Sequence, residues 1–204
     1  MKWEKERKAV LETACKMLEL GLTVGSSGNV SLRLGGEELL AITPSGHYYD
    51  ELSPEDIIVT DFEGEVIEGE GAPSIELMMH VAIYKARPDV RAIVHFHSPF
   101  ASVVAVMGDE IPPILEDQKV FLRGEVKVVP HLPPGSKELA EEVVKALGMQ
   151  NAVILQNHGA VCVGPGLKEA LNACLYLEKT AMAFVFATLA GRARLSHPGE
   201  RRWT

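Results

Sequence analysis

The chain is poor in cysteine and in long apolar runs. Its three cysteines, Cys15, Cys162 and Cys174, form no C-x-x-C pair, which excludes a disulfide framework and a cysteine-based zinc knuckle. The longest apolar run, residues 181–190, covers about half of a bilayer span. The first residues lack the apolar core of a signal peptide. We therefore expect a cytoplasmic protein that does not enter a membrane.

Positive charge and nucleotide-binding motifs are also scarce. Lysine and arginine number 20 against 28 acidic residues, which gives a formal net charge of −8. This acidic balance excludes an extended surface for a phosphate backbone, so nucleic acid is not an expected partner. The sequence contains neither a Walker motif nor G-x-G-x-x-G. Nucleotide-cofactor chemistry therefore has no support.

The length and the apolar content favour one domain. The 204 residues, 47% of them apolar, are enough for a single domain over residues 1–204. Helical periodicity predicts a first helix over residues 3–20 and a mostly apolar last helix over about 167–189. Ser74 is the predicted N-cap of a helix that reaches about Arg87. Short alternating or apolar runs between the helices predict strands, several joined as hairpins. The predicted fold is α/β, with a central mixed, largely antiparallel sheet flanked by helices.

Two histidines stand one residue apart at the end of an apolar run, in IVHFH at residues 93–97. Because strand side chains alternate between faces, His95 and His97 point the same way and can share a metal ion. A hydrogen-bonded histidine pair is the alternative. His158, at the tip of a strand-turn-strand in LQNHGAVCVG, offers a third ligand. Three histidines with an open coordination position are typical of a catalytic zinc or similar divalent site. The other histidines compete for this role: His47, His80, His131 and His197.

Glu76 lies in the predicted first turn of a helix, in APSIELMMH. The helix dipole favours an ionised carboxylate at this position. The residue is either a simple helix N-terminal acid or, if it faces the metal, a fourth ligand at rest and a general base once substrate displaces it. His80 lies four residues later on the same helix face and is the strongest rival as a ligand.

Two polar loops contain glycine: GSSGNVS at residues 25–31 and TPSGHYY at 43–49. Their hydroxyls, asparagine amide and backbone N–H groups can surround an anion without a lysine. Ser74, at a predicted helix N-terminus, would add a contact. Each loop alone is equally well an ordinary turn. Together they predict a small phosphorylated substrate.

The same segments resemble the class II aldolase/adducin family, in particular its L-fuculose-1-phosphate aldolase group. The motifs GLTVGSSGNVSLR, ITPSG, APSIELMMH, AIVHFH and LQNHGAVCVG occur in the family's order and spacing over nearly the whole chain. The resemblance implies a zinc-dependent enzyme with about nine strands in its central sheet. It also implies a homotetramer with active sites at the subunit interfaces.

The resemblance also assigns roles to individual residues. It implies that His95, His97 and His158 bind zinc and that Glu76 is the catalytic acid/base. The residues that match the family's phosphate-binding loops are Ser27, Gly28, Asn29, Ser45, Gly46 and Ser74.

The implied reaction is the reversible aldol cleavage of a ketose 1-phosphate to dihydroxyacetone phosphate and a small aldehyde such as lactaldehyde. Zinc would stabilise the negative charge of an enediolate as a Lewis acid, while Glu76 moves the proton to and from carbon.

Two positions depart from the fuculose-phosphate aldolase pattern. Ile75 stands where these aldolases usually carry a second serine, and Glu116 stands at about the position of a tyrosine that donates a proton to the aldehyde oxygen. Glu116 is therefore the candidate proton donor. Both departures resemble the methylthioribulose-1-phosphate dehydratase branch, and L-ribulose-5-phosphate 4-epimerase is a further alternative. An adducin-like assembly module is the non-enzymatic alternative, although such a module needs no metal ligands. We favour the aldolase.

Overall fold

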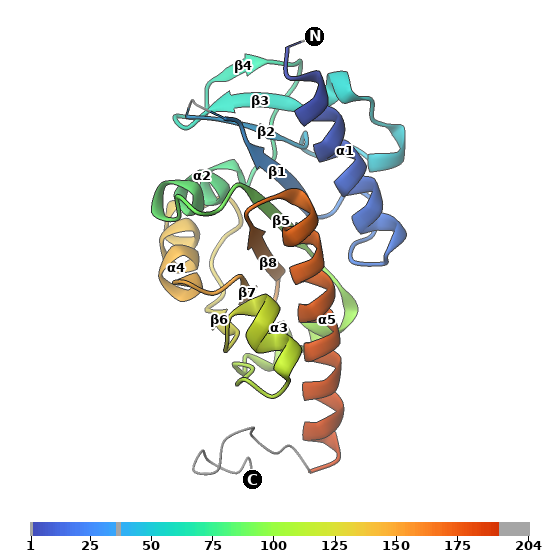
Figure 1. The fold of residues 1–204 in the computed structure, drawn as a ribbon, viewed down its shortest axis with the longest axis vertical. Coiled ribbons are helices and arrows are strands. Elements are labelled where there is room, and N and C mark those ends of the chain that lie inside the picture. Colours follow the sequence, from blue (N-terminus) through green and yellow to red (C-terminus); the bar gives the residue numbers. More distant parts are fainter. Residues whose placement is uncertain (1, 36–37, 192–204) are drawn as a thin grey trace.

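The computed structural model describes residues 2–35 and 38–191. These residues form one mixed sheet flanked by helices (Figure 1). The strand order is β4-β3-β2-β1-β5-β8-β7-β6, and all pairs are antiparallel except β6 with β7. The strands are β1 (Asn29–Arg33), β2 (Leu39–Ile42), β3 (Ile58–Asp61), β4 (Val66–Glu68), β5 (Ala92–Phe96), β6 (Lys127–Val129), β7 (Ala152–Leu155) and β8 (Gly159–Gly164). The predicted α/β fold class is confirmed.

The expected number of strands was slightly too high. The described residues form eight strands rather than about nine. Ile111 pairs with Val126 only through an isolated bridge, because Pro112 and Pro113 follow and have no backbone N–H with which to extend the pairing.

Helices cover both faces of the sheet. They are α1 (Glu4–Glu19), α2 (Leu77–Ala86), α3 (Pro99–Met107), α4 (Lys137–Leu147) and α5 (Leu167–Leu189), with a short π-helical segment at Gln118–Leu122 and two 3-10 turns at Tyr49–Glu51 and Pro54–Asp56. One buried cluster joins α1, α3 and α5 to one face, and a second joins α2 and α4 to the other. In Figure 1, α2 and α4 lie together on one side of the sheet, with α1 and α5 on the other.

The alternation along β5 shows how the sequence distributes its side chains between these two cores. Val94 and Phe96 are buried in the cluster with α1, α3 and α5, whereas Ile93 is buried in the cluster with α2 and α4. A strand with both faces buried carries a nearly continuous apolar sequence. His95 interrupts that sequence on the face that α2 covers, so a buried polar group lies near the centre of the sheet.

Helix α5 runs along the sheet in Figure 1. By length and composition it is apolar enough to span a membrane. Its buried residues, among them Ala173, Leu177, Ala181 and Phe184, pack in the cluster that includes β5 and β8. Part of the apolar character of α5 is thus used in the core of the domain.

Candidate functional site

The ends of β5 and β8 bring the candidate histidines together. His95 is the fourth residue of β5 and only 1% exposed, and His97 follows the last residue of that strand. His158 lies in the turn that joins β7 to β8, directly after Asn157, which adopts a left-handed conformation (φ 56°). Because β5 and β8 are neighbours in the centre of the sheet, the turn before β8 lies beside the C-terminal end of β5.

The three imidazoles form a compact group. One ring nitrogen of each histidine lies within 4.8 Å of the others, an arrangement that could hold a metal ion. The Nε2 atoms of His95 and His97 are 2.9 Å apart, and the ring centroids of His95 and His158 are separated by 4.8 Å. The sequence-based expectation that His158 would join the H-x-H pair is thus met in geometry, while metal binding by this group stays a prediction.

Glu76 approaches the same group from the start of α2. Its side chain is buried, with Oε2 located 3.0 Å from His95 Nε2 and Oε1 located 3.7 Å from His158 Nε2. Asn29 Nδ2 donates a hydrogen bond to Oε2 at 2.9 Å. The carboxylate therefore faces the histidines rather than solvent, as the functional interpretation of this residue requires.

The predicted start of α2 was wrong by two residues. The helix begins at Leu77 with Glu76 as its N-cap residue, whereas Ser74 was the predicted cap. The Ser74 N–H is bonded to the Thr43 carbonyl, and Pro73 bridges to Pro44, so this segment is still paired with the preceding loop and cannot begin the helix. Ser74 Oγ instead accepts a hydrogen bond from the Glu76 N–H at 3.3 Å.

The hydrogen bonds of His95 leave a place for a cation. His95 Nδ1 lies 3.0 Å from the Ala160 carbonyl, which can only accept, so Nδ1 carries a proton and a neutral ring has its lone pair on Nε2. That lone pair faces Glu76 Oε2, an acceptor as well. Two lone pairs that face each other repel, and a bound proton or metal ion would remove this repulsion. Glu76 Oε1 is also buried without a hydrogen-bond partner among the described residues.

The pKa values of His97 and His158 favour the neutral forms that bind metal. Burial and the neighbouring imidazoles of His95 and His158 lower the pKa of His97 to about 4. Burial and His95 also lower the pKa of His158. Burial is the largest influence on the pKa of Glu76 and would raise it, but His95, His158 and the hydrogen bond from Asn29 together hold that pKa below its usual range. Neutral imidazoles beside a carboxylate are the protonation states that a divalent metal ion requires.

A cavity of about 230 Å³ opens beside the histidines. Its lining includes every residue to which the family resemblance assigned phosphate binding. It also includes all three histidines and Glu76. Gly28 (φ 77°) brings its loop so close to β5 that a Cβ there would lie 2.4 Å from the His95 carbonyl oxygen. The lining residues that were not predicted as site residues are Ser26, Pro44, Ile75 and Pro134.

These additional residues had a signal in the sequence: Pro44 stands in TPSGHYY, and Ile75 stands where the resemblance implies a second serine. Ser26 stands in the same glycine loop as Ser27, so the loop motif already contained it. Pro134 precedes Gly135 (φ 77°), whose Cβ position lies 2.8 Å from the Ile75 carbonyl oxygen. The P-P-G sequence thus marked a turn, although nothing in it indicated which loop the turn would contact.

The remaining candidate residues, Glu116 and the other histidines, are not among the described residues that line this cavity. Glu116 does not line the cavity; its side chain is 82% exposed and pairs with Lys119 at 2.9 Å. His80 is fully buried, but its Nδ1 is 2.7 Å from Ser31 Oγ, and it is not part of the three-histidine group. His47 and His131 are exposed and do not line the cavity, and His197 lies outside the described residues.

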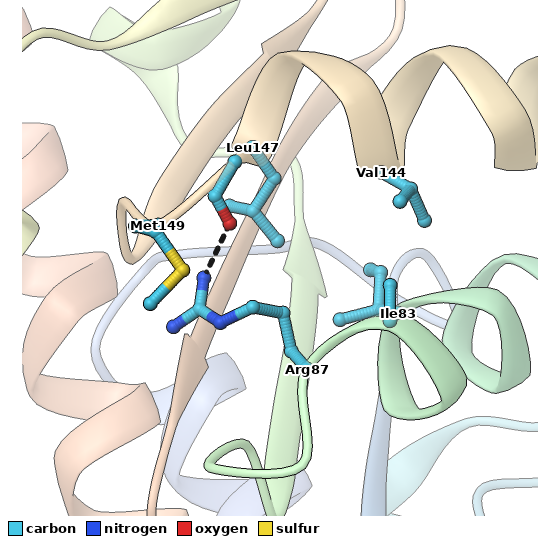
Figure 2. A pocket seen from close by; sticks show the side chains of 7 residues that line it. Ile83, Arg87, Val144, Leu147 and Met149 are labelled. Carbon is cyan, nitrogen blue, oxygen red and sulfur yellow. Dashed lines mark hydrogen bonds between the residues drawn. The ribbon is translucent and has the colours of Figure 1, made fainter.

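A second cavity, of about 260 Å³, lies between α2 and α4 (Figure 2). Ile83, Val144 and Leu147 give it a mainly apolar lining. The Arg87 guanidinium at its edge donates to the Gly148 carbonyl at 2.7 Å and pairs with Asp89. This cavity therefore offers packing space but no unpaired charge, and the polar cavity beside the histidines is the candidate active site.

Gly159 controls the position of His97, and its replacement by alanine is expected to weaken metal binding. A Cβ at residue 159 would lie 2.3 Å from His97 Cδ2 and 2.6 Å from the Phe96 carbonyl oxygen, so the imidazole must move. We expect metal affinity to fall about 10- to 100-fold and the free energy of unfolding by about 1–3 kcal/mol. Chelator competition and urea unfolding measure the two effects.

Gly35→Ala is the matched control, because its Cβ would meet only Arg91 Nη2, at an ordinary 3.9 Å. If Gly159→Ala binds metal as tightly as Gly35→Ala does, then the position of His97 does not matter for binding.

The fold and this cavity define an α/β protein whose three-histidine group could hold a metal ion beside a buried carboxylate. Residues 8–185 match the family described as Class II Aldolase and Adducin N-terminal domain. The chain belongs to this family.

Relatives with known names agree with this assignment. The chain is 36% identical to 5-deoxy-D-ribulose 1-phosphate aldolase of Bacillus thuringiensis serovar kurstaki, over 94% of the chain and 90% of the relative. It is 34% identical to 3-oxo-tetronate 4-phosphate decarboxylase of Haemophilus influenzae, over 92% and 89%. The solved structure of an L-fuculose 1-phosphate aldolase matches with a TM-score of 0.91 and 33% identity, over 96% of this chain and 91% of that one.

The comparisons establish the general class of activity. The protein is an enzyme of the class II aldolase family, a lyase, and class II aldolases are metal-dependent. The adducin-like assembly alternative has no support from these relatives. Their names differ in substrate and include a decarboxylase, so the family alone does not identify the reaction of this chain.

Proposed function

We propose that this enzyme reversibly cleaves a ketose 1-phosphate, of the L-fuculose 1-phosphate type, to dihydroxyacetone phosphate and a small aldehyde such as lactaldehyde. The observation that carries the proposal is the shared cavity, in which three imidazoles and the buried Glu76 lie beside two glycine-containing polar loops. Two of the relatives are named as aldolases of ketose 1-phosphates. This agrees with a substrate that carries both a ketone and a phosphate.

We assign the metal to His95, His97 and His158, with Glu76 as an additional ligand in the resting enzyme. Zinc is the proposed ion, because neutral imidazoles with an open coordination position suit it. When bound, a divalent ion supplies Lewis acidity that stabilises negative charge on the oxygens of a ketone and of an adjacent hydroxyl.

Glu76 is the proposed acid/base. Its carboxylate is held by Asn29 and lies 3.0 Å from His95 Nε2, so it is oriented toward a substrate that occupies the histidine end of the cavity. Because its pKa lies below the usual range, the group is ionised at neutral pH, which is the form that a general base requires. We assign to it the proton at the carbinol carbon of dihydroxyacetone phosphate.

We assign the phosphate to the two glycine-containing loops that line the cavity. Gly28 and Gly46 have positive φ angles of 77° and 76°, a conformation that lets successive N–H groups converge on an anion. The side chains proposed to take part are Ser27, Asn29, Ser45 and Ser74, all of which line the cavity.

Ser45→Ala is expected to raise KM for the phosphorylated substrate about tenfold with little change in kcat, because one hydroxyl donor to a charged group is lost. Ser45 is half-buried in the cavity lining, and its N–H is bonded to the Ala72 carbonyl, which the substitution leaves intact. Initial-rate kinetics measure the effect. Ser102→Ala, on α3 and outside the cavity lining, is the control; equal KM values in the two variants would remove Ser45 from the phosphate site.

The donor of a proton to the aldehyde oxygen comes from outside the part of the chain that lines the cavity. We propose a cytoplasmic homotetramer with active sites between subunits, in which Glu116 of one subunit reaches the cavity of its neighbour. The exposure of Glu116 supports this role. Exposed apolar residues on α5, Met182, Phe186 and Leu189, support a subunit contact.

A dehydratase acting on methylthioribulose 1-phosphate is the second candidate. Ile75 favours it, because this apolar side chain lines the cavity and is 66% exposed, at the position where the resemblance implies a second serine in the fuculose-phosphate aldolases. Both reactions begin with removal of a proton next to a ketone, so the same Glu76 serves either one.

Product analysis separates the two reactions. The metal-loaded enzyme is incubated with L-fuculose 1-phosphate, 5-deoxy-D-ribulose 1-phosphate and methylthioribulose 1-phosphate, and the products are identified by NMR. The proposal predicts dihydroxyacetone phosphate together with an aldehyde from at least one of the first two compounds. Loss of water from methylthioribulose 1-phosphate, without aldehyde from any substrate, would replace the aldolase by the dehydratase.

A further inference from the structure

Helix α3 begins directly after the metal-site histidines, and its N-terminus is bonded in an unusual way. Ser98, the residue after His97, is the N-cap residue of α3, with an extended backbone (φ −72°, ψ 155°). A serine in this position normally accepts a hydrogen bond from the N–H of the second or third helical residue. Ser98 makes no such bond; its hydroxyl donates to Glu178 Oε2 at 2.5 Å instead.

Glu178, on α5, replaces the missing cap. Its Oε1 accepts the Phe100 N–H at 2.9 Å, and its Oε2 accepts the Ala101 N–H at 3.0 Å. A carboxylate at a helix N-terminus is favoured by the helix dipole, and bonds to a charged acceptor are the stronger kind. One side chain, 80 residues distant in sequence, thus holds the residue after His97 and the first turn of α3.

This contact bears on His97 because His97 lies between two fixed points. On one side, Phe96 is paired with Ala160 of β8. The His97 N–H itself donates to the Leu22 carbonyl at 3.1 Å. On the other side the chain continues into Ser98, which is fully buried and whose hydroxyl is bound to Glu178. Loss of the Glu178 contacts would leave the chain after His97 held by the hydrogen bonds within α3, such as Ser102 N–H to the Ser98 carbonyl, without the link to α5.

A cap for α3 would not by itself need a carboxylate from α5, since serine at the N-cap position commonly supplies the capping hydrogen bond itself. The arrangement uses the Ser98 hydroxyl to bind Glu178, which ties the histidine segment to the helix that packs beside α3. We infer that Glu178 is a positioning residue that fixes His97 for metal binding. This inference rests on the proposed role of His97 as a metal ligand.

The test measures the affinity of the full-length chain for Co²⁺, read from the visible absorption of the bound ion, together with the melting temperature of the metal-free protein. Glu178→Gln keeps the size of the side chain but loses the charge and at least one of the three acceptor contacts. We expect its Co²⁺ affinity to fall about tenfold or more. Ser98→Ala, a milder change that removes only the hydroxyl, is expected to give a smaller loss in the same direction.

Val104→Ala is the control for stability, because Val104 is fully buried in the middle of α3 and its truncation lowers the melting temperature without touching Ser98. We expect this variant to bind Co²⁺ within twofold of wild type. Equal Co²⁺ affinity in Glu178→Gln and wild type would overturn the positioning role. So would a loss in Val104→Ala as large as that in Glu178→Gln, since the effect would then follow stability alone. A wild type that binds no Co²⁺ would remove the metal centre itself.

Discussion

Replacing Glu76 by glutamine is expected to lower the kcat of the metal-loaded enzyme by about 10²- to 10⁴-fold, the usual contribution of a positioned general base. Glutamine has the same size and can still accept the hydrogen bond from Asn29, but it cannot take up a proton. The three imidazoles remain, so bound metal should stay near the wild-type amount. Initial rates and elemental analysis of the same preparation give both quantities.

The matched control is Glu12→Gln, which removes a carboxylate from an exposed position on α1. It should leave both the rate and the metal content unchanged. If Glu76→Gln retains the activity of Glu12→Gln, another group transfers the proton and the assignment of Glu76 is wrong.

His95→Ala is expected to lose both the metal and the activity, and also to destabilise the metal-free protein. The imidazole is 1% exposed and pairs with the buried Glu76 carboxylate at 3.0 Å. Its removal leaves that carboxylate without its main partner, for which the cost is about 3–5 kcal/mol. Metal content and urea unfolding without metal measure the two consequences.

His131→Ala is the control, because this histidine is exposed and does not line the cavity. Adding Glu76→Gln to His95→Ala should recover part of the lost stability, since a neutral amide is less costly to bury than an unpaired carboxylate. A His95→Ala protein with full metal content would rule out the three-histidine centre.

Local rules were sufficient to predict much of the site from the sequence. Strand alternation alone placed His95 and His97 on one face, and the glycine loops were recognisable as turns. The strand-turn-strand pattern added His158, although the turn between β7 and β8 could be placed beside β5 only by the pairing of β5 with β8. Local sequence therefore gave the chemical groups, and the sheet topology gave their proximity.

The error at the start of α2 came from a contact between distant segments. Ser74 has the sequence signature of a helix cap, but its pairing with the loop at Thr43 delays the helix to Leu77. No cap was predicted at α3, but Ser98 has the same signature there and Glu178 takes over the capping contacts. In both cases a long-range hydrogen bond displaced the local one, and sequence spacing contains no information about such a competition.

The most direct test of the central claim follows proton exchange at the carbinol carbon of dihydroxyacetone phosphate in D2O by NMR. Wild type loaded with zinc, metal-free wild type and zinc-loaded Glu76→Gln are compared at equal concentration. We predict exchange that requires zinc and is lost in Glu76→Gln, because a metal-assisted base removes this proton. Zinc-loaded wild type that holds one metal ion per chain and catalyses no exchange would contradict the proposed aldol chemistry.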